Sequence, residues 1–511
     1  MIYDIAIIGG GINGVGTALE AVSRGLSVVL CEQDDLASGT SSKSSKLIHG
    51  GLRYLEHSAF SLVKESLQER EILLHTAGHM VEPIPFIIPY EKNLRAAWLI
   101  RLGLYCYDLL NINSQLKKSK TLHFESLNED PQNPNPIKRS IKKAFQYSDC
   151  TVDDARLVIL VARLASQLGA SIMTRSKCVD VQCDSNQSWN LSIKNMRDPS
   201  CPLTSIKAKV LINASGPWIK DTLDKIIKLP SNYQVKKVKG SHIIVPKLYE
   251  QKQAYLLQHR DGRVVFTIPY LKQYTIIGTT DIAFEDEPQT ANITAEEIEY
   301  LCNVVNQYFH HPLKEKQIIS SWAGVRALWD NGSVNPSQIS RDCKIDTQLN
   351  AIQHPPLINI YGGKLTTYRS LGEKLINKLA ALFPQLKESC SKELSLPGSM
   401  PYNTFDNFFA STQKLYSFVP TAVLLRLARN YGYDIKEILN DCQQFSDLGE
   451  DFGHGLTQKE IEFLIQNEWA ETCEDILWRR TKLGLIYNNT QIKHLHEWLE
   501  AYNCLEKAAA Q

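Results

Sequence analysis

The chain has 511 residues, of which 43% are hydrophobic and 22% are charged, ordinary values for folded globular domains. A chain of this length exceeds what one hydrophobic core usually supports, so we expect two or three domains. The 56 Lys and Arg residues balance 55 Asp and Glu residues, which argues against a generally basic protein that binds nucleic acid.

The 12 cysteines are scattered singly, without a CxxC pair or a Cys/His cluster at zinc spacing. This pattern is typical of reduced thiols in a cytoplasmic protein, and we predict no metal site. The first residues, MIYDIAIIGGG, lack the charged region and the length of a signal peptide. Because no apolar run approaches the ~20 residues that a spanning helix needs, we expect a cytoplasmic protein or one that lies against a membrane without crossing it.

The N-terminal residues predict a strand–helix–strand unit. Residues 5–8 form a short apolar run, typical of a strand that is buried on both faces. A helix should follow from about Gly14 to Arg24 and end at Gly25. The stretch LSVVLCE, residues 26–32, predicts the second strand.

Gly9, Gly11 and Gly14, between these strands, have the GxGxxG spacing of a dinucleotide-binding turn. Glycines permit a tight turn and close backbone approach, so a pyrophosphate can sit at the helix N-terminus, where free N–H groups favour anions. Glu32 ends the second strand, where a carboxylate would accept a hydrogen bond from a ribose hydroxyl. The pattern predicts binding of NAD or FAD; the alternative is a turn with only a structural role.

Two later strand–turn–helix patterns occupy residues 210–227 and 357–383, and strand-like stretches such as GSHIIVP, GRVVFTIPY and YTIIGTTD separate them. We therefore expect a nucleotide-binding domain built from separate pieces, with an antiparallel sheet inserted between them. Residues 394–403 predict a linker, beyond which strand signals give way to helical periods.

The stretch GGKLTTYR bears on the choice between the two cofactors. It presents Gly362, Gly363 and the hydroxyls of Thr366 and Thr367 at the start of a helix. A helix N-terminus there could stabilise the negative charge of reduced flavin, which favours FAD over NAD. An ordinary helix cap is the alternative interpretation of the same residues.

Together with TSSKSSKLIHGGLRYLE, YSDCTVDDARLV, KGSHIIVP, INASGPW and IGTTD, these segments resemble the FAD-dependent glycerol-3-phosphate dehydrogenases of the membrane-associated respiratory type. The resemblance covers nearly the whole chain, and KLIHGGLRYLE and GGKLTTYR are specific to this family within the D-amino-acid-oxidase-like flavoproteins. It implies oxidation of sn-glycerol 3-phosphate to dihydroxyacetone phosphate by hydride transfer from C2 to flavin N5, with electrons passed to a membrane quinone. It also implies a peripheral position on the inner face of the cytoplasmic membrane, and it is compatible with a homodimer.

The resulting prediction is an α/β fold in three parts. A discontinuous, Rossmann-like FAD-binding domain comprises residues 1–75, 145–230 and 320–388. An inserted antiparallel-sheet substrate or cap domain comprises residues 76–144 and 231–319, and an all-α C-terminal domain comprises residues 389–511.

The resemblance also implies which residues contact FAD. In this family the Ser-rich segment wraps the pyrophosphate and the flavin, and other contacts come from the glycine turn and from the two later turns. The predicted cofactor-binding residues are Gly9, Gly11, Asn13, Gly14, Glu32, Thr40, Ser41, Ser42, Ser45, Lys46, Leu47, Ala214, Gly216, Gly363, Lys364, Leu365 and Thr366.

His49 and Arg53 lie four residues apart in LIHGGLRYLE. If this stretch opens a helix, both side chains fall on one face and could point into a single pocket beside the flavin. A guanidinium suits bidentate phosphate binding, and an imidazole can take a hydroxyl proton near neutral pH. We therefore predict Arg53 as a substrate ligand and His49 as the catalytic base, although an isolated His is most often a hydrogen-bonded core or surface residue.

Arg326, Arg341 and Lys364 match substrate-pocket positions of the family, and Tyr54 belongs to the same predicted substrate-binding set. Arg326 lies in an apolar setting, where a charge is costly unless it meets an anion. We predict that Arg326 acts in catalysis by stabilising the developing alkoxide, since guanidinium is a poor base. For any single arginine, a solvated surface role is the alternative. The family commonly has Pro at the position of Ala327.

Residues 93–110 mix Trp98, Leu102 and other apolar side chains with Arg95 and Arg101, and the basic runs KKSK and KRSIKK follow. An amphipathic helix that lies on anionic lipid has this pattern. A core helix with two exposed arginines has it too, so the segment allows either interpretation.

Two other functions stay open. An oxidase of the same fold would give electrons to oxygen and make hydrogen peroxide, whereas a non-catalytic flavoprotein would act as a redox sensor. The clustered His49, Arg53, Arg326 and Lys364 argue against a sensor, because a sensor needs no site for a phosphate.

Overall fold

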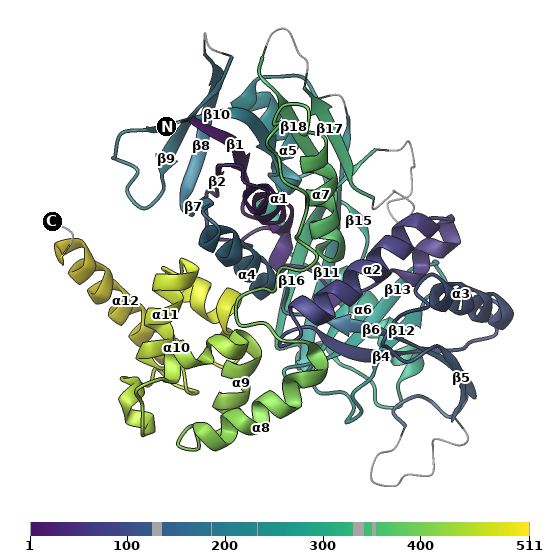
Figure 1. The fold of residues 1–511 in the computed structure, drawn as a ribbon. Coiled ribbons are helices and arrows are strands. Elements are labelled where there is room, and N and C mark those ends of the chain that lie inside the picture. The colour runs from purple at the N-terminus through teal and green to yellow at the C-terminus, as the bar shows by residue number, and fades with distance from the viewer. Residues whose placement is uncertain are drawn as a thin grey trace.

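The computed structural model describes residues 2–124, 135–184, 187–231, 233–330, 342–349 and 354–509. Within these residues the chain forms two sheets with helices packed on them, and a separate group of helices at its C-terminal end (Figure 1). This confirms the predicted class: an α/β nucleotide-binding part, an inserted sheet and an all-α C-terminal part.

The first sheet has a parallel centre. Its strand order is β17 (Lys344–Gln348), β18 (Leu357–Tyr361), β10 (Thr204–Asn213), β1 (Ile2–Ile8), β2 (Val28–Cys31) and β7 (Ser171–Met173). The strands from β18 to β7 run parallel, while β17 is antiparallel to β18. An antiparallel hairpin, β8 (Ser176–Cys183) and β9 (Trp189–Asn195), extends from β10. Strands whose two faces are both covered need continuous apolar runs, as β1 and β2 have.

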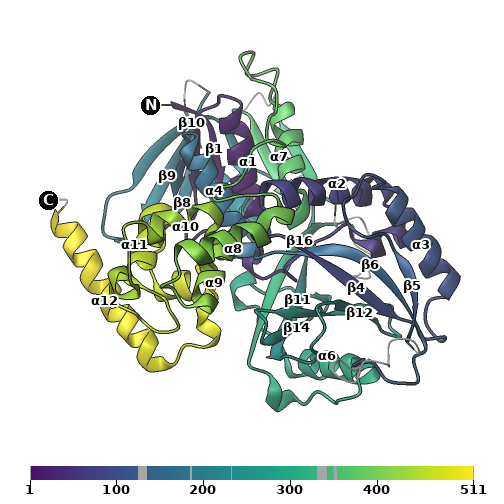
Figure 2. The ribbon, with the colours of Figure 1, turned by 60° about the horizontal axis from the view of Figure 1, so that its bottom comes forward.

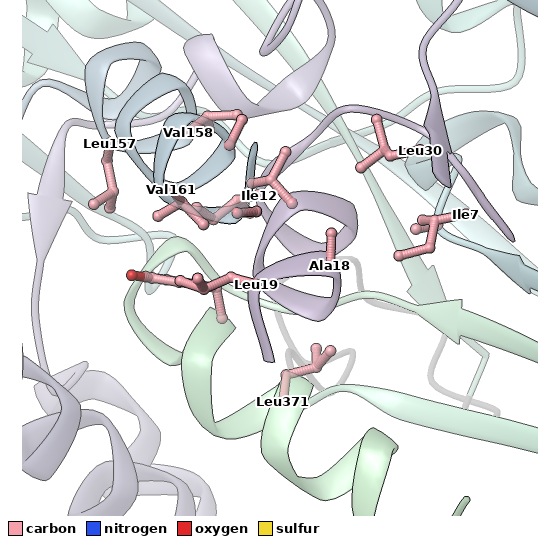
Figure 3. Packing of buried hydrophobic residues seen from close by; sticks show 14 of the residues in the cluster. Ile7, Ile12, Ala18, Leu19, Leu30, Leu157, Val158, Val161 and Leu371 are labelled. Carbon is pink, nitrogen blue, oxygen red and sulfur yellow. The ribbon is translucent and has the colours of Figure 1, made fainter. Parts of the chain in front are cut away.

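Three helices pack on one face of this sheet: α1 (Ile12–Ser23), α4 (Asp154–Gln167) and α7 (Tyr368–Asn377). Figure 3 shows Ile7 and Leu30 of the strands beneath α1, with Val158 of α4 and Leu371 of α7 on either side of that helix. Each fully buried side chain of this size contributes about 1.5–3 kcal/mol. This packing fixes the N-terminal ends of α1 and α7, where the site is built.

The second sheet is largely antiparallel. Its order is β15 (Ile282–Ala283), β11 (Val235–Pro246), β14 (Tyr274–Gly278), β13 (Val264–Tyr270), β12 (Ala254–Gln258), β4 (Glu82–Pro89), β6 (Lys143–Thr151) and β3 (Leu47–Ile48). Two more strands pair off this path, β16 (Ser320–Trp329) with β11 and β5 (Lys120–His123) with β6. Only β4 and β12 form a parallel pair among the described strands of this sheet.

Helices cover both faces of the second sheet (Figure 2). α6 (Ala295–Tyr308) packs on one face against Ile243 and Val245 of β11. α2 (Phe60–Thr76) and α3 (Ala97–Leu109) pack on the other face, where Ile244 of the same strand points. This alternation follows the two-residue period of a strand.

The expected domain limits differ from the limits of the sheets at three places. β3, β6 and β16 all belong to the second sheet, whereas the predicted FAD-binding domain includes residues 47–48, most of β6 and all of β16. The division at residues 75, 145, 230 and 320 stays a proposal.

The C-terminal helices have their own apolar core. They are α8 (Phe405–Leu415), α9 (Thr421–Tyr431), α10 (Ile435–Leu439), α11 (Gln458–Glu468) and α12 (Asn489–Ala509). Buried ion pairs join them to the first sheet, as between Arg156 of α4 and Glu468 of α11. Across the described residues, no helix combines the length and apolarity that crossing a membrane requires.

Candidate active site

The turn between β1 and α1 has no room for a side chain at two of its glycines. Gly9 has a φ of 115°, and a Cβ atom there would lie 2.5 Å from the carbonyl oxygen of Ala214. A Cβ atom on Gly14 would lie 1.9 Å from the carbonyl oxygen of Gly9. Because α1 begins at Ile12, its first N–H groups face this turn. The geometry suits a pyrophosphate held at a helix N-terminus.

Glu32 directly follows β2 and lies beside the same turn. Its carboxylate accepts hydrogen bonds from the backbone N–H groups of Gly10, at 2.6 Å, and Asp34, at 2.9 Å. Burial raises the pKa of Glu32 to about 7, against the opposing effect of these two bonds. The side chain is therefore held by the backbone in a fixed orientation, as a ribose-binding carboxylate must be.

The Ser-rich segment contacts the start of α1 and β16 of the second sheet. The Ser41 hydroxyl oxygen accepts from the backbone N–H of Ile12 at 3.0 Å, and a Cβ atom on Gly11 would lie 3.1 Å from that oxygen. The Thr40 hydroxyl donates to the carbonyl oxygen of Val325 in β16 at 2.6 Å. This segment therefore joins the start of α1 to the strand that carries Arg326.

Farther along the segment, the side chains have protein partners. The Ser42 hydroxyl donates to the carbonyl oxygen of Gly39 at 3.4 Å. The Lys46 ammonium is buried and pairs with Asp154 at 2.6 Å, and Leu47 is buried in β3. Any contact of Lys46 with a cofactor would therefore come from its backbone rather than from its ammonium.

Two later turns meet the glycine turn. Ala214 donates its N–H to the carbonyl oxygen of Ile8 at 2.9 Å, and Gly216 has a φ of 58°. Asn13 of α1 donates its side-chain amide to the carbonyl oxygen of Gly362 at 2.9 Å.

Gly363, with a φ of 100°, also lies against Asn13, since its Cβ atom would be 2.7 Å from the amide nitrogen. The buried Oδ1 of Asn13 has no hydrogen-bond partner among the described residues. After Gly363, Lys364 caps the short helix η9 (Leu365–Thr367), which leads into α7. An unsatisfied buried oxygen, a fixed carboxylate and glycines without room for Cβ atoms are what a bound dinucleotide such as FAD would fit.

The stretch does not form one helix over His49 and Arg53, so the condition that would put both side chains on one helical face is not met. β3 ends at Ile48, and the short helix η2 (Leu52–His57) begins only after Gly50 and Gly51. Gly51 has a φ of 80°, and a Cβ atom there would lie 2.1 Å from the ring of Tyr54. The left-handed residue breaks the helical path that the spacing suggested.

Arg53 and Arg326 nevertheless converge on one carboxylate. Arg326 donates to Asp281 at 2.6 Å, and a guanidinium nitrogen of Arg53 lies 3.8 Å from the other oxygen of Asp281. The Asp281 side chain is 5% exposed, while those of Arg53 and Arg326 are 21% and 25% exposed. Both arginine side chains therefore lie close to this carboxylate and stay partly exposed.

Tyr54, which follows Arg53 in η2, lies against Lys364. The Lys364 ammonium lies 4.1 Å from the centre of the Tyr54 ring and 3.3 Å from the Ser66 hydroxyl oxygen. His49 is half-buried, and its backbone N–H donates to the hydroxyl of Thr366, two residues after Lys364, at 3.3 Å. Arg341, the remaining predicted ligand, lies outside the described residues.

Two residues that the prediction omitted belong to this region. Asp281 ends the stretch YTIIGTTD, and a lone carboxylate just after a buried strand was the available signal. His242 of β11 places Nε2 2.8 Å from the Ser45 hydroxyl, and its ring stacks on Trp322 with centroids 5.0 Å apart. Burial, together with Arg326, lowers the pKa of His242 to about 3, so this imidazole is neutral at physiological pH.

Comparison with known proteins agrees with this geometry. The family model of FAD dependent oxidoreductases matches residues 4–369, and the model described as the C-terminal domain of alpha-glycerophosphate oxidase matches residues 389–502. A glycerol-3-phosphate dehydrogenase of Pseudomonas aeruginosa is 44% identical over 98% of this chain and 95% of that protein. A D-erythritol 1-phosphate dehydrogenase of Brucella abortus is 41% identical over 98% of each chain.

Among solved structures, a glycerol-3-phosphate dehydrogenase of Bacillus halodurans complexed with FAD has a TM-score of 0.77 and 25% identity, covering 100% of this chain and 91% of that one. The match of the first family model extends over more than half of the chain, and the similarity to the relatives extends over nearly all of it. The chain therefore belongs to the FAD-dependent oxidoreductases and uses FAD as its cofactor.

Proposed function

We propose that this enzyme oxidises sn-glycerol 3-phosphate to dihydroxyacetone phosphate. The observation that carries the proposal is the convergence of Arg53 and Arg326 on the buried carboxylate of Asp281, close to the segments that fit FAD. Arg326 directly follows Val325, whose carbonyl oxygen accepts from Thr40 of the Ser-rich segment. The relative named glycerol-3-phosphate dehydrogenase, which is similar over 98% of this chain, supports the same substrate.

Arg53 and Lys364 would bind the phosphate of the substrate. A guanidinium can donate two parallel hydrogen bonds to phosphate oxygens, and an ammonium adds a compact positive charge. Tyr54 would hold Lys364 in position through the contact of its ring with the ammonium. Arg341 would be a further ligand of the same site.

His49 would take the proton of the C2 hydroxyl. When bound, FAD supplies the acceptor for the hydride that leaves C2, so the alcohol becomes a ketone. Arg326 would stabilise the negative charge on the substrate oxygen as the proton leaves, and its contact with Asp281 holds the guanidinium in place for this. The proton and the hydride together account for the two hydrogens that the substrate loses.

For the electron acceptor we propose a membrane quinone. A cavity of about 190 Å³ lies between η2 and α3, and its lining is mostly apolar, including Leu52, Ile100 and Leu256. Arg53 lines this cavity and also contacts Asp281, so the cavity adjoins the proposed substrate site. The ring of a quinone is apolar and carries polar oxygens at its edge, so a quinone suits such a cavity. Oxygen as acceptor, as in an oxidase, is the competing proposal.

We further propose that α3 lies on the inner face of the cytoplasmic membrane. Its outer side exposes large apolar residues, among them Trp98, which is 69% exposed, and Leu109. The exposed Lys117 and Lys118 follow the helix and would meet anionic headgroups. An amphipathic helix of this kind binds at the lipid surface without crossing it.

A longer polyol phosphate is the second candidate substrate. The relative named D-erythritol 1-phosphate dehydrogenase is 41% identical over nearly the full length, so overall similarity does not separate the two substrates. Both carry a secondary hydroxyl and a phosphate, which the same cationic residues would bind. The ratio of kcat/KM for sn-glycerol 3-phosphate and D-erythritol 1-phosphate measures the preference directly.

Anaerobic mixing tests the proposed function. The FAD-loaded protein should lose its oxidised-flavin absorbance when sn-glycerol 3-phosphate is added, and should keep it when glycerol is added. A quinone analogue should then restore the absorbance. Flavin that stays oxidised with sn-glycerol 3-phosphate would contradict the proposal, and rapid formation of hydrogen peroxide in air would favour the oxidase.

A further inference from the structure

The short segment that carries His49 and leads to Arg53 lies directly against α3. The backbone N–H of Gly50 donates to the hydroxyl oxygen of Tyr107 in α3 at 2.9 Å. A Cβ atom on Gly50 would lie 2.5 Å from that oxygen and 2.7 Å from Leu67 of α2. Gly50 is therefore packed between two helices, and the Tyr107 hydroxyl is the nearer of two acceptors of its N–H; the other, Asp149 Oδ1, lies at 3.4 Å.

The Tyr107 hydroxyl is itself fixed by a buried network. It donates to Asp149 of β6, with both carboxylate oxygens at 2.8 Å, and Arg70 of α2 donates to Asp149 at 2.7 Å. Tyr107 is 3% exposed, and the side chains of Asp149 and Arg70 are 1% and 3% exposed. Burial raises the pKa of Tyr107 well above its usual value, so the hydroxyl keeps the proton that it donates to Asp149.

The segment has a second anchor on its other side. The backbone N–H of His49 donates to the Thr366 hydroxyl at 3.3 Å, which ties the segment to the turn before α7. Two successive N–H groups, those of His49 and Gly50, thus hold the backbone to opposite neighbours. Losing the bond to Tyr107 would leave the N–H of Gly50 with only the longer contact to Asp149, at 3.4 Å, in a Gly50–Gly51 pair that restricts the backbone least.

We infer that Tyr107 is a positioning residue, which holds the His49–Arg53 segment in its working geometry through the N–H of Gly50. The inference rests on the proposed function, because it assigns His49 and Arg53 their roles there. Reacting groups must be placed closely, and a misplacement of about 1 Å can cost about 10²-fold in rate. Tyr107 acts without touching substrate or cofactor.

Tyr107→Phe tests this role, since it removes only the hydroxyl. Tyr147→Phe is the matched control: it makes the same change in the neighbouring buried ring, whose centroid lies 5.8 Å from that of Tyr107. Each FAD-loaded variant is mixed anaerobically with increasing sn-glycerol 3-phosphate, and the rate of flavin reduction is expressed per bound flavin. Reoxidation of the chemically reduced variants by a soluble dye is measured as well.

For Tyr107→Phe we expect the limiting rate of flavin reduction to fall about tenfold or more, with reoxidation by the dye unchanged. Tyr147→Phe should keep the limiting rate of the parent. A purely structural role would lower the yield of FAD-loaded protein but leave the rate per flavin unchanged. Tyr107→Phe at the parent's limiting rate would therefore overturn the inference and leave the proposed function intact.

Two further outcomes are decisive. If Tyr107→Phe does not retain FAD, Asp149→Asn replaces it, because that variant keeps the Tyr107 hydroxyl but weakens its hold, together with the longer contact of Asp149 to the N–H of Gly50. Asp149→Asn should then show the same loss in limiting rate, and parent-like reduction by this variant would overturn the inference. A parent enzyme that sn-glycerol 3-phosphate fails to reduce would overturn both this inference and the proposed function.

Discussion

A pair of arginines approaches one buried carboxylate beside the C-terminal helices, and another pair does so at the proposed substrate site. Beside the C-terminal helices, Arg479 and Arg480 of η13 (Asp475–Arg480) both donate to Asp35, and their side chains are 8% and 0% exposed. At the proposed substrate site, Arg53 and Arg326 approach Asp281 with 21% and 25% of their side chains exposed. The residue types are the same, but the solvent access differs.

The difference in access separates two uses of an arginine. Removing a guanidinium that is buried against a carboxylate is costly, because the carboxylate then stays buried without enough positive charge beside it. A guanidinium that contacts a carboxylate while part of its side chain stays exposed can also meet an anionic solute. We therefore expect changes near Asp35 to act on folding and changes near Asp281 to act on substrate turnover.

At the proposed substrate site, His49→Asn should have the largest effect on the rate of flavin reduction. If His49 takes the hydroxyl proton, anaerobic flavin reduction by sn-glycerol 3-phosphate should slow by about 10²–10⁴-fold. The affinity for substrate should change much less, because Arg53 and Lys364 remain. Stopped-flow absorbance separates the two quantities. Near-parent reduction by His49→Asn, with reduction abolished in Arg326→Ala, would show that proton removal does not depend on His49.

Beside Asp35, Arg480→Ala should lower the stability of the protein. Removing a partner from a buried ion pair costs about 3–5 kcal/mol, and since Arg479 stays next to Asp35 we expect the lower end, about 3 kcal/mol in the free energy of unfolding. Denaturant titration of the FAD-loaded protein measures it, and flavin reduction per bound FAD should stay near the parent's rate.

The control for this variant is Arg197→Ala. Arg197 pairs with Glu471 across the same boundary between the first sheet and the C-terminal helices, but its side chain is 43% exposed. An exposed pair contributes less than about 1 kcal/mol. Similar losses of stability in Arg197→Ala and Arg480→Ala would mean that burial does not distinguish the two kinds of ion pair.

The smallest expected effect concerns pH and FAD. Burial raises the pKa of Glu32 to about 7 in the protein without FAD, so the carboxyl group is mostly protonated below that pH. A ribose hydroxyl would donate to the ionised form, so FAD should bind about tenfold more tightly at pH 8 than at pH 6. Fluorescence titration of the apoprotein measures the affinity. Glu32→Gln should flatten this dependence, and an equal pH dependence in the variant would assign it to another group.

Local patterns predicted the nucleotide-binding turn well. Strand, glycines, helix and Glu32 follow one another within 32 residues, so spacing alone conveys their arrangement. No single helix forms over His49 and Arg53, and the reason is also local. Gly50 and Gly51 lie between these residues, and Gly51 adopts a positive φ. A four-residue spacing indicates one helical face only where the residues between can continue the helix.

Contacts between residues that are far apart in the chain could not be predicted from such local patterns. Asp281 meets Arg326 across 45 residues of chain, and Ser45 meets His242 across 197. Tyr107 was seen in the sequence only as part of an amphipathic stretch, because its bond to Gly50 depends on how α3 packs on the second sheet. Pairing between distant strands and helices decides these contacts, and spacing within one segment does not encode it.

The central claim is that Arg53, together with Lys364, recognises the phosphate of the substrate. Its most direct test is the ratio of kcat/KM for sn-glycerol 3-phosphate to kcat/KM for glycerol, in the parent and in Arg53→Ala, with Arg197→Ala as control. The parent and the control should strongly favour the phosphate ester. In Arg53→Ala the ratio should fall by an amount equivalent to about 2–5 kcal/mol, because a charge-assisted contact is lost. A ratio unchanged in Arg53→Ala, or a parent that oxidises glycerol equally well, would contradict the account.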